Sequence, residues 1–450
     1  MFTPIGPMLE IGTKKPLLLY CLAAIALAMT GIVSAQDDVE APLPDLAVQE
    51  EATVGRTFMP GDFARFAPRN ALDMLNQVPG FSIRSGRQGR GFGQVNTNVL
   101  VNGQRLSSKS QNVFDQLRRV TAGNVERIEI VDGAALGIPG LSGQVANVIT
   151  ASGDISGSYE YRTMHRPKYA EPSWYGGEVS VSGSTSRLEW NAAYTHGIGR
   201  GAAGGPGVIT DEFGNVTEWR DILWNFEGDF PQLSGSLKWD GPNSMVANLN
   251  VQYSRNYTDF SNDEDRDLIT GVDRFRDYDN SGRSYGYEIG ADLEFELGAG
   301  RMKLIGLERL DDNDSQSDSV LIFEDDSPST GSRFASQSES GERIGRVEYR
   351  WDSLGGNWQL DAEAAFNRLD QASQLFNLDI AGDLLQIPLP NSTGEVTEDR
   401  YEVILTHGRT LANGLTLQLG LGGESSELEQ TGPGGLTRSF WRPKGSLSLA

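Results

Sequence analysis

The sequence predicts a transmembrane antiparallel β-barrel that follows a small α+β domain. Three observations predict the barrel: apolar and polar residues alternate over segments of about ten residues, tight turns recur at even spacing, and long polar segments join the other strand ends. Within residues 284–297, for example, Ile289 and Leu293 share an apolar face. Asp292 and Glu294 belong to the polar face. Such alternation suits a strand with lipid on one side and a wet lumen on the other.

The turns and the long connections are predicted at opposite ends of the strands. The tight turns lie about 57 residues apart, centred near Thr185, Pro242, Ala299, Gly355 and Ala412. The long polar connections are expected at 197–231, 257–283, 311–341 and 369–397. A soluble β-sandwich also alternates, but it does not need connections of about 30 residues that always lie at one end. The barrel is therefore the preferred prediction.

The chain begins with a secretory signal peptide, expected at residues 1–35. Lys14 and Lys15 precede an apolar stretch, and small residues then favour cleavage after Ala35. A membrane anchor helix is the alternative. The single cysteine, Cys21, lies in this leader, so we expect the exported chain to have no disulfide and no thiolate metal site.

A small α+β domain is predicted between the leader and the barrel. A helix is expected within 68–83, where Ala71, Met74, Leu75 and Val78 recur at helical spacing and Pro79 follows. The remaining elements are expected as a strand into an Asn102-Gly103 turn at 98–105, a helix at 113–119, a strand at 124–131 and a strand ending the segment 140–150. Tyr and Trp become frequent only after this domain, which supports a boundary near residue 150.

Composition and motifs exclude several function classes. The net charge of −23 argues against a nucleic-acid partner. His165, His196 and His407 are too scattered for a metal centre or a catalytic triad, so no enzyme and no catalytic residue are predicted. The glycine motif at 199–204 lacks the helix that a dinucleotide site needs. The carboxylate pairs of the polar connections have no histidine or nucleophile beside them, and solvated loops are the preferred interpretation.

Four segments of the first domain carry a resemblance to a known family. They read ALDMLNQVPGF at 71–81, NVLVNGQRL at 98–106, NVERIEIVDGAA at 124–135 and GLSGQVANVIT at 140–150. In this order, before a Trp- and Tyr-rich β region, they resemble the plug domain of TonB-dependent outer-membrane receptors. The resemblance implies a plug inside a barrel of about 22 strands. It divides the chain into a signal peptide (1–35), a periplasmic tail (36–57), a plug (58–155) and a barrel (156–450).

The resemblance also implies function and partners. It implies active uptake of a small extracellular ligand, either a siderophore-like metal chelate or a carbohydrate nutrient, driven by the TonB–ExbB–ExbD complex. The implied location is the outer membrane, in contact with lipid and lipopolysaccharide. The alternative function is a non-energised porin or a surface-binding barrel. The plug argues against a porin, because a filled lumen does not conduct.

Two plug-side segments are candidate sites. The TonB-interacting segment is expected at Glu51, Ala52, Thr53, Val54 and Gly55, whose extended character suits pairing with a partner strand. An unremarkable flexible tail is the alternative. Ligand contacts are expected from Arg84, Arg87, Arg90 and Phe92 in a glycine-rich plug loop, because guanidinium groups suit anionic oxygens. The alternative is salt bridging between these arginines and acids of the barrel lumen, such as Glu294 or Glu348.

A calcium loop is the one candidate metal site, and no other cofactor is predicted. Asp277, Asp279, Ser281, Gly282 and Glu288 match the spacing D-x-D-x-S-G-x5-E, which wraps oxygens around Ca²⁺. The flanking helices of such a site are missing from the sequence pattern. An acidic outer loop that binds divalent ions loosely is the alternative.

The barrel portion is expected to be incomplete. Eleven strands are predicted from Ser156 onward, and a twelfth begins near Ser439. A twelve-stranded lumen is too narrow for a plug of about 100 residues, whose radius of gyration is about 13 Å. We therefore expect this sequence to be a fragment of a longer chain.

Overall fold

A computed structural model describes residues 55–84, 97–103, 113–133, 143–151, 155–166, 169–411, 415–432 and 434–449. Every described residue belongs to one compact unit, Thr53–Ala450. The predicted signal peptide and most of the predicted TonB-interacting segment therefore lie outside the described residues. Within the described part of the chain, no helix has the length and apolar character needed to cross a membrane.

The small domain is built on a four-stranded sheet with the order β1-β3-β4-β2. Among its described strands, β2 and β4 are parallel neighbours and the other pairs are antiparallel. The strands are β1 (Arg56–Phe58), β2 (Val99–Val101), β3 (Val125–Asp132) and β4 (Gln144–Thr150). The helices are η1 (Pro60–Phe66), α2 (Ala71–Leu75), α3 (Val113–Arg119) and η3 (Ala122–Asn124). Both predicted helices are present, although the first is only five residues long.

The core of this domain lies between α2, α3 and the sheet. The apolar stripe predicted for the first helix, Ala71, Met74, Leu75 and Val78, is buried there. Asn70 begins α2, because its side-chain oxygen accepts a hydrogen bond from the backbone N–H of Asp73 at 2.9 Å. The other buried members of this core are Phe63, Leu72, Val99, Val113, Leu117, Val125, Ile128, Ile130, Ala146 and Val148.

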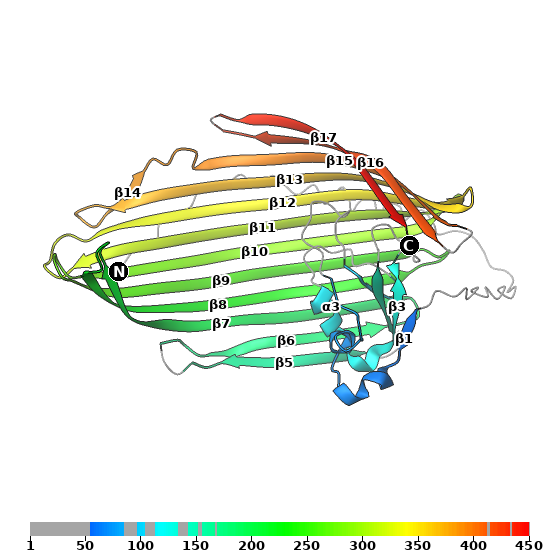
Figure 1. The fold of residues 1–450 in the computed structure, drawn as a ribbon, viewed down its shortest axis with the longest axis horizontal. Helices are drawn as coiled ribbons and strands as arrows, with labels where there is room; N and C mark the ends of the chain where they lie inside the picture. Colours follow the sequence, from blue (N-terminus) through cyan, green and yellow to red (C-terminus); the bar gives the residue numbers. More distant parts are fainter. Residues whose placement is uncertain are drawn as a thin grey trace, which may run out of the picture. The chain divides into compact units, whose positions relative to one another are not determined.

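The rest of the chain forms one large antiparallel sheet (Figure 1). Its twelve-strand path runs in sequence order from β5 to β17, and β14 pairs with β13 beside that path. The strands are β5 (Ser156–Met164), β6 (Ser173–Ser184), β7 (Leu188–Thr210), β8 (Val216–Asp240), β9 (Val246–Leu268), β10 (Arg274–Leu297), β11 (Gly300–Phe323), β12 (Thr330–Ser353), β13 (Gly356–Leu378), β14 (Leu384–Ile387), β15 (Thr393–Thr410), β16 (Thr416–Gln430) and β17 (Leu436–Leu449). The predicted fold class and the predicted twelve strands are confirmed.

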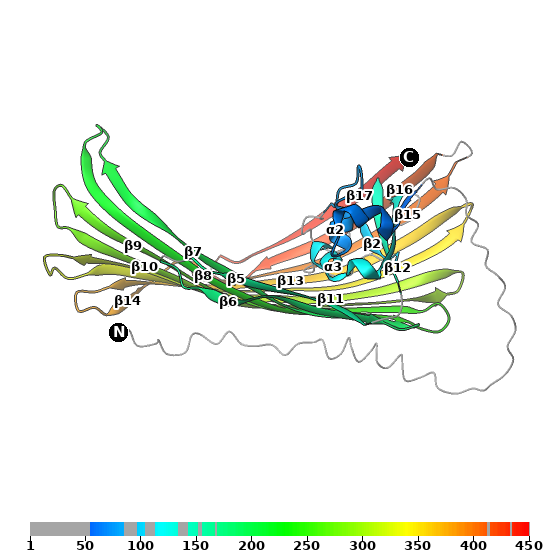
Figure 2. The same ribbon diagram turned by 90° about the horizontal axis from the view of Figure 1, so that it is seen from below.

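The predicted long connections are wrong, because these segments are strands. β7 and β8 stay paired from Leu188↔Trp239 to Ile209↔Glu218, through most of the segment 197–231 that was expected to be a loop. Backbone ladders need only N–H and C=O groups, so pairing continues where the apolar alternation ends. The actual turn between these strands is short, and the Asp211 N–H donates to the Asn215 carbonyl at 2.9 Å. Figure 2 shows the long strands β7 to β10, in green, bending along their length.

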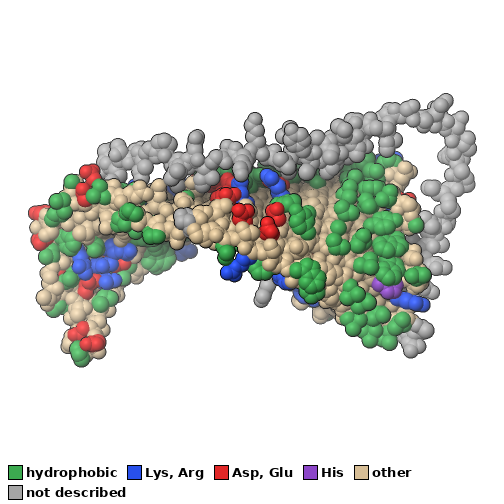
Figure 3. Space-filling model, turned by 90° about the horizontal axis from the view of Figure 1, so that it is seen from above, with side chains coloured by type: hydrophobic (Ala, Val, Ile, Leu, Met, Phe, Trp, Pro, Cys, Tyr) green, Lys and Arg blue, Asp and Glu red, His purple; other side chains and the backbone are tan. Residues whose placement is uncertain are grey.

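The two faces of the large sheet differ as the alternation predicts. We call the face of Ile289 and Leu293 the lipid face, and the face of Asp292 and Glu294 the lumen face. Exposed apolar side chains occupy the lipid face near the short turns, for example Leu360 and its register partner Leu405. In Figure 3 hydrophobic side chains gather most densely toward the right-hand end, where the short turns lie, and charged ones toward the middle and left.

An aromatic row marks the lipid face beside the short turns. The rings of Tyr349 and Trp351 stack at 5.4 Å, and those of Trp351 and Trp358 at 6.2 Å. His407 on β15 continues the row, 4.3 Å from Trp358. Aromatic side chains of this kind sit at the interface between hydrocarbon and water. The row therefore locates one boundary of the membrane-facing band.

Candidate functional site

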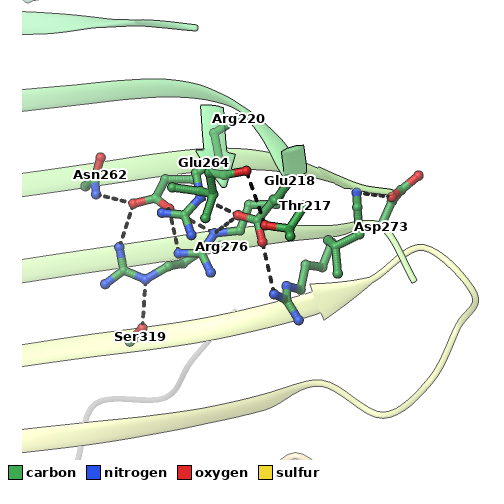
Figure 4. A network of polar contacts seen from close by, with 12 residues as sticks. Thr217, Glu218, Arg220, Asn262, Glu264, Asp273, Arg276 and Ser319 are labelled. Atoms are coloured by element: carbon green, nitrogen blue, oxygen red, sulfur yellow. Dashed lines mark hydrogen bonds and ion pairs between the residues drawn. The ribbon is translucent and has the colours of Figure 1, made fainter. Parts of the chain in front are cut away.

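A network of charged side chains lies where β8, β9 and β10 approach the turn at residues 269–273 (Figure 4). Arg274 and Arg276 lie an even number of residues from Asp292 on the unbroken strand β10, so they share the lumen face. Arg266 is the register partner of both Arg274 and Arg220. The six members of the network are Glu218, Arg220, Glu264, Arg266, Arg274 and Arg276.

The two glutamates form the centre of the network, and each is only 6% exposed. The Glu264 carboxylate forms ion pairs with Arg266, at an N···O distance of 2.5 Å, and with Arg276, at 3.1 Å. Arg274 binds Glu218 at 3.2 Å, and Arg220 contacts both glutamates. Burial alone would raise the pKa of Glu264, but hydrogen bonds and charges from its cationic neighbours hold that pKa below its ordinary value. The cationic neighbours therefore favour the negative form of the Glu264 carboxylate.

The network carries a surplus of positive charge. Four guanidinium groups surround two carboxylates, although the whole chain has a net charge of −23. Two buried polar atoms, Arg274 Nε and Asn262 Oδ1, have no hydrogen-bond partner among the residues that the structure describes. Guanidinium groups in such a position recognise carboxylate and phosphate oxygens.

A row of aromatic rings lies beside the network. The ring centroids of Trp224 and Phe260 are 6.0 Å apart, and those of Phe260 and Tyr278 are 6.2 Å apart. The guanidinium of Arg276 lies 4.8 Å from the centre of the Tyr278 ring. Trp224 is the register partner of Asn262, so the unpartnered amide oxygen belongs to the same patch. The arrangement places ring faces next to anion-binding groups.

A pocket of about 750 Å³ is lined by residues of β8 to β11, and it shares Phe260 with the aromatic row. Its wall includes Glu227, Asp259, Asp279 and Asp318, together with Tyr169 from the β5–β6 connection. Burial, and then the charges of nearby aspartates, raise the pKa of Asp279. This pocket is acidic, so its chemistry is opposite to that of the arginine network.

The residues of the predicted calcium site lie on a strand rather than in a loop. Asp277, Asp279, Ser281 and Glu288 all lie on strand β10, which is paired on both sides. An extended strand sends Asp277 and Asp279 to one face and Glu288 to the other, so these oxygens do not surround one ion. Among the described residues, no group of three or more His, Cys, Asp or Glu side chains is arranged to hold a metal ion.

The predicted plug-side residues are only partly described. Arg84 is exposed, and its backbone N–H donates to Asn98 Oδ1 at 2.7 Å. Arg87, Arg90 and Phe92 lie outside the described residues. Of the predicted TonB-interacting segment, the structure describes only Gly55, which is exposed and directly precedes β1. Neither site is tested by these positions.

Sequence reasoning missed the arginine network. The signal was present, because charged residues recur two positions apart in Glu218-x-Arg220, Glu264-x-Arg266 and Arg274-x-Arg276. The segments were predicted to be loops, and loops have no common face. Only the strand register places the three pairs side by side.

Comparison with known proteins identifies the first domain. Residues 56–143 match the family model described as TonB-dependent Receptor Plug Domain. No curated protein matches the chain.

Several solved structures resemble the chain at low identity. The ferric preacinetobactin receptor BauA from Acinetobacter baumannii has 12% identity and a TM-score of 0.38, over 87% of this chain and 61% of that one. The siderophore receptor PiuA from Acinetobacter baumannii has 13% identity and a TM-score of 0.32, over 88% and 61%. The copper transporter OprC has 12% identity and a TM-score of 0.36, over 88% and 60%. This chain spans about 60% of the length of these proteins.

Proposed function

We propose that this chain, a TonB-dependent receptor with its plug domain in residues 56–143, serves the energised uptake of a small ligand across the outer membrane. The plug domain is the observation that carries the proposal. A domain of this family precedes an antiparallel sheet whose lipid face exposes apolar side chains. A plug domain argues against a passive pore, because a plug closes the lumen that a porin keeps open.

The proposed energy source is the TonB–ExbB–ExbD complex, acting on the segment from Glu51 to Gly55. Strand β1 follows this segment at once and pairs with β3 through only three residues, from Arg56↔Ile130 to Phe58↔Ile128. A pull on the chain before Arg56 would load these few hydrogen bonds first. The short strand therefore supports the proposal that force enters the plug sheet here.

The proposed ligand is a metal chelate or a carbohydrate nutrient, captured on the extracellular side. The proposed mature chain begins after Ala35 and contacts outer-membrane lipid and lipopolysaccharide. Two of the similar structures are a ferric preacinetobactin receptor and a copper transporter, and these ligands are those of the similar proteins alone. For this chain the arginine network and its aromatic neighbours are the best candidate contact surface.

Uptake in cells with and without TonB tests the function. Cells that express the chain should accumulate one member of a panel of iron chelates and oligosaccharides, and accumulation should stop when TonB or the proton gradient is removed. Uptake that continues without TonB would instead support a non-energised barrel.

A pair of proline variants tests the proposed TonB-interacting segment. Val54→Pro should abolish uptake, because proline removes a backbone donor from a pairing strand. Val39→Pro in the same tail is the matched control and should leave uptake unchanged. Equal uptake by both variants would move the TonB contact elsewhere.

A further inference from the structure

We propose that the arginine network of β8, β9 and β10 binds a ligand that joins two negative charges to a flat ring. This inference rests on the proposed function and names the chemical class of its ligand. The site consists of the six charged residues of the network with Trp224, Phe260 and Tyr278. It lies beside the turn at residues 269–273, at the strand ends opposite the turns near Pro242 and Ala299.

The charge balance of the network is the first argument. Among the described residues, ion pairs join the four arginines to the two glutamates and to no other carboxylate, which leaves two positive charges uncompensated. The neighbouring acids Asp221, Asp265 and Asp267 alternate with these residues along β8 and β9 and so belong to the lipid face. Like charges held together on a half-buried surface attract a counter-ion.

A second ion-pair network in the same sheet shows what a purely structural cluster looks like. It extends over β12, β13, β15, β16 and β17, and the ion pairs among the described residues join five cations to five anions. Its members are Arg346, Arg350, Arg400, Arg442 and Lys444 with Glu348, Asp361, Glu363, Glu402 and Glu424. Ion pairs between neighbouring strands therefore account for the balanced network. On β8 to β10 the arginines outnumber the glutamates, and a bound anion would neutralise the remaining positive charge.

Arg274 and Arg276 are the residues best placed to hold that anion. Each uses one ion pair to a glutamate, and their side chains are 27% and 22% exposed. The Arg274 Nε donor has no partner among the described residues. Removing either arginine still leaves its glutamate bound by Arg220 and Arg266. Binding by these two groups is therefore separable from the structural pairing beneath them.

The adjacent rings define the second half of the ligand. Trp224, Phe260 and Tyr278 form a continuous row, and Arg276 lies over the last ring. A planar group that carries the two charges could contact this row while its oxygens meet the guanidinium groups.

Binding by the purified full chain in detergent tests the proposal without TonB. The probes are phthalate, which has two charges and a ring, succinate, which has the charges alone, and benzyl alcohol, which has the ring alone. At low ionic strength phthalate should bind most tightly by calorimetry, succinate more weakly, and benzyl alcohol without saturation. Phthalate should also change the tryptophan fluorescence, and Trp224→Phe should remove that change.

Variants on and off the site complete the test. Arg274→Gln and Arg276→Gln should each weaken phthalate binding about tenfold, the size of one charge-assisted hydrogen bond. Arg255→Gln is the control, because Arg255 lies on β9 beside Tyr253 and Tyr257 rather than in the network. Glu218→Gln removes a competing negative charge and should tighten binding several-fold.

Three results would overturn the proposal: no saturable phthalate binding, equal binding by the wild type and by the Arg274 and Arg276 variants, or no gain from Glu218→Gln. The last variant keeps the test decisive if an arginine variant fails to fold. Because binding is measured without TonB, a failed uptake experiment leaves this result intact. Conversely, loss of the anion site leaves TonB-dependent uptake open to a neutral ligand.

Discussion

Ile128, in the middle of β3, is expected to dominate the stability of the plug domain. Its side chain is 0% exposed, and its backbone is the register partner of Val148 on β4 and of Phe58 on β1. Ile128→Ala removes three carbons, worth about 2.4 kcal/mol of transfer free energy at about 0.8 kcal/mol each. The residual cavity brings the expected loss to about 3–4 kcal/mol.

Hydrogen exchange on the full chain measures this loss. If β4 is protected by the same cooperative unit, its amides should lose a few hundredfold, roughly 100- to 700-fold, of their protection in Ile128→Ala, since each 1.4 kcal/mol is tenfold. Ile155→Ala makes the same chemical change at a side chain that is 73% exposed, and it should cost less than about 0.5 kcal/mol. Equal protection in both variants would refute the conclusion that this core holds the plug together.

Three further predictions concern buried charge, pH and a plug contact. In a denaturant titration, Arg400→Ala should destabilise the sheet by about 3–5 kcal/mol, because Arg400 is 3% exposed and its loss leaves buried carboxylates unpaired. The control Arg442→Ala changes a side chain that is 60% exposed, and it should cost at most about 1 kcal/mol in the same titration. The raised pKa of Asp279 means that the folded chain holds the proton of this carboxyl group more tightly than the unfolded chain does. The free energy of unfolding should therefore fall as pH rises through that pKa. Asp279→Asn should raise the melting temperature by about 1 °C at neutral pH and have no effect at a pH low enough to protonate the aspartate. Asn102 donates to Glu189 of β7 at 3.0 Å, and Asn102→Ala should increase protease cleavage in the plug while circular dichroism of the sheet stays constant.

The strand pattern was predictable because it is local. Alternation at Ile289 and Asp292 reports a strand with two different surroundings, and the tight turns recur at the length of a hairpin unit. The same reasoning placed the buried stripe Met74, Leu75 and Val78 on the first helix. Each of these features depends on residues a few positions apart.

The prediction failed where the chain leaves the apolar band. Strand β10 begins at Arg274, ten residues before the alternation that marked it, because its ladder to β9 and β11 continues through polar residues. Hydropathy reports the medium that a side chain faces, and both faces of the strand extensions carry polar side chains. A method that detects strands by apolar alternation therefore cannot see them.

By itself the sequence determined the class of the fold, the twelve strands of the main path and the resemblance of the first domain to a plug. The tertiary structure alone decided which charged residues meet. Arg276 reaches Glu264 twelve positions away, and Arg274 reaches Glu218 on a strand that is not its neighbour. Register sets these meetings, and a shift of one residue would turn each side chain to the opposite face. Pairing between distant segments carries that information, and no local pattern contains it.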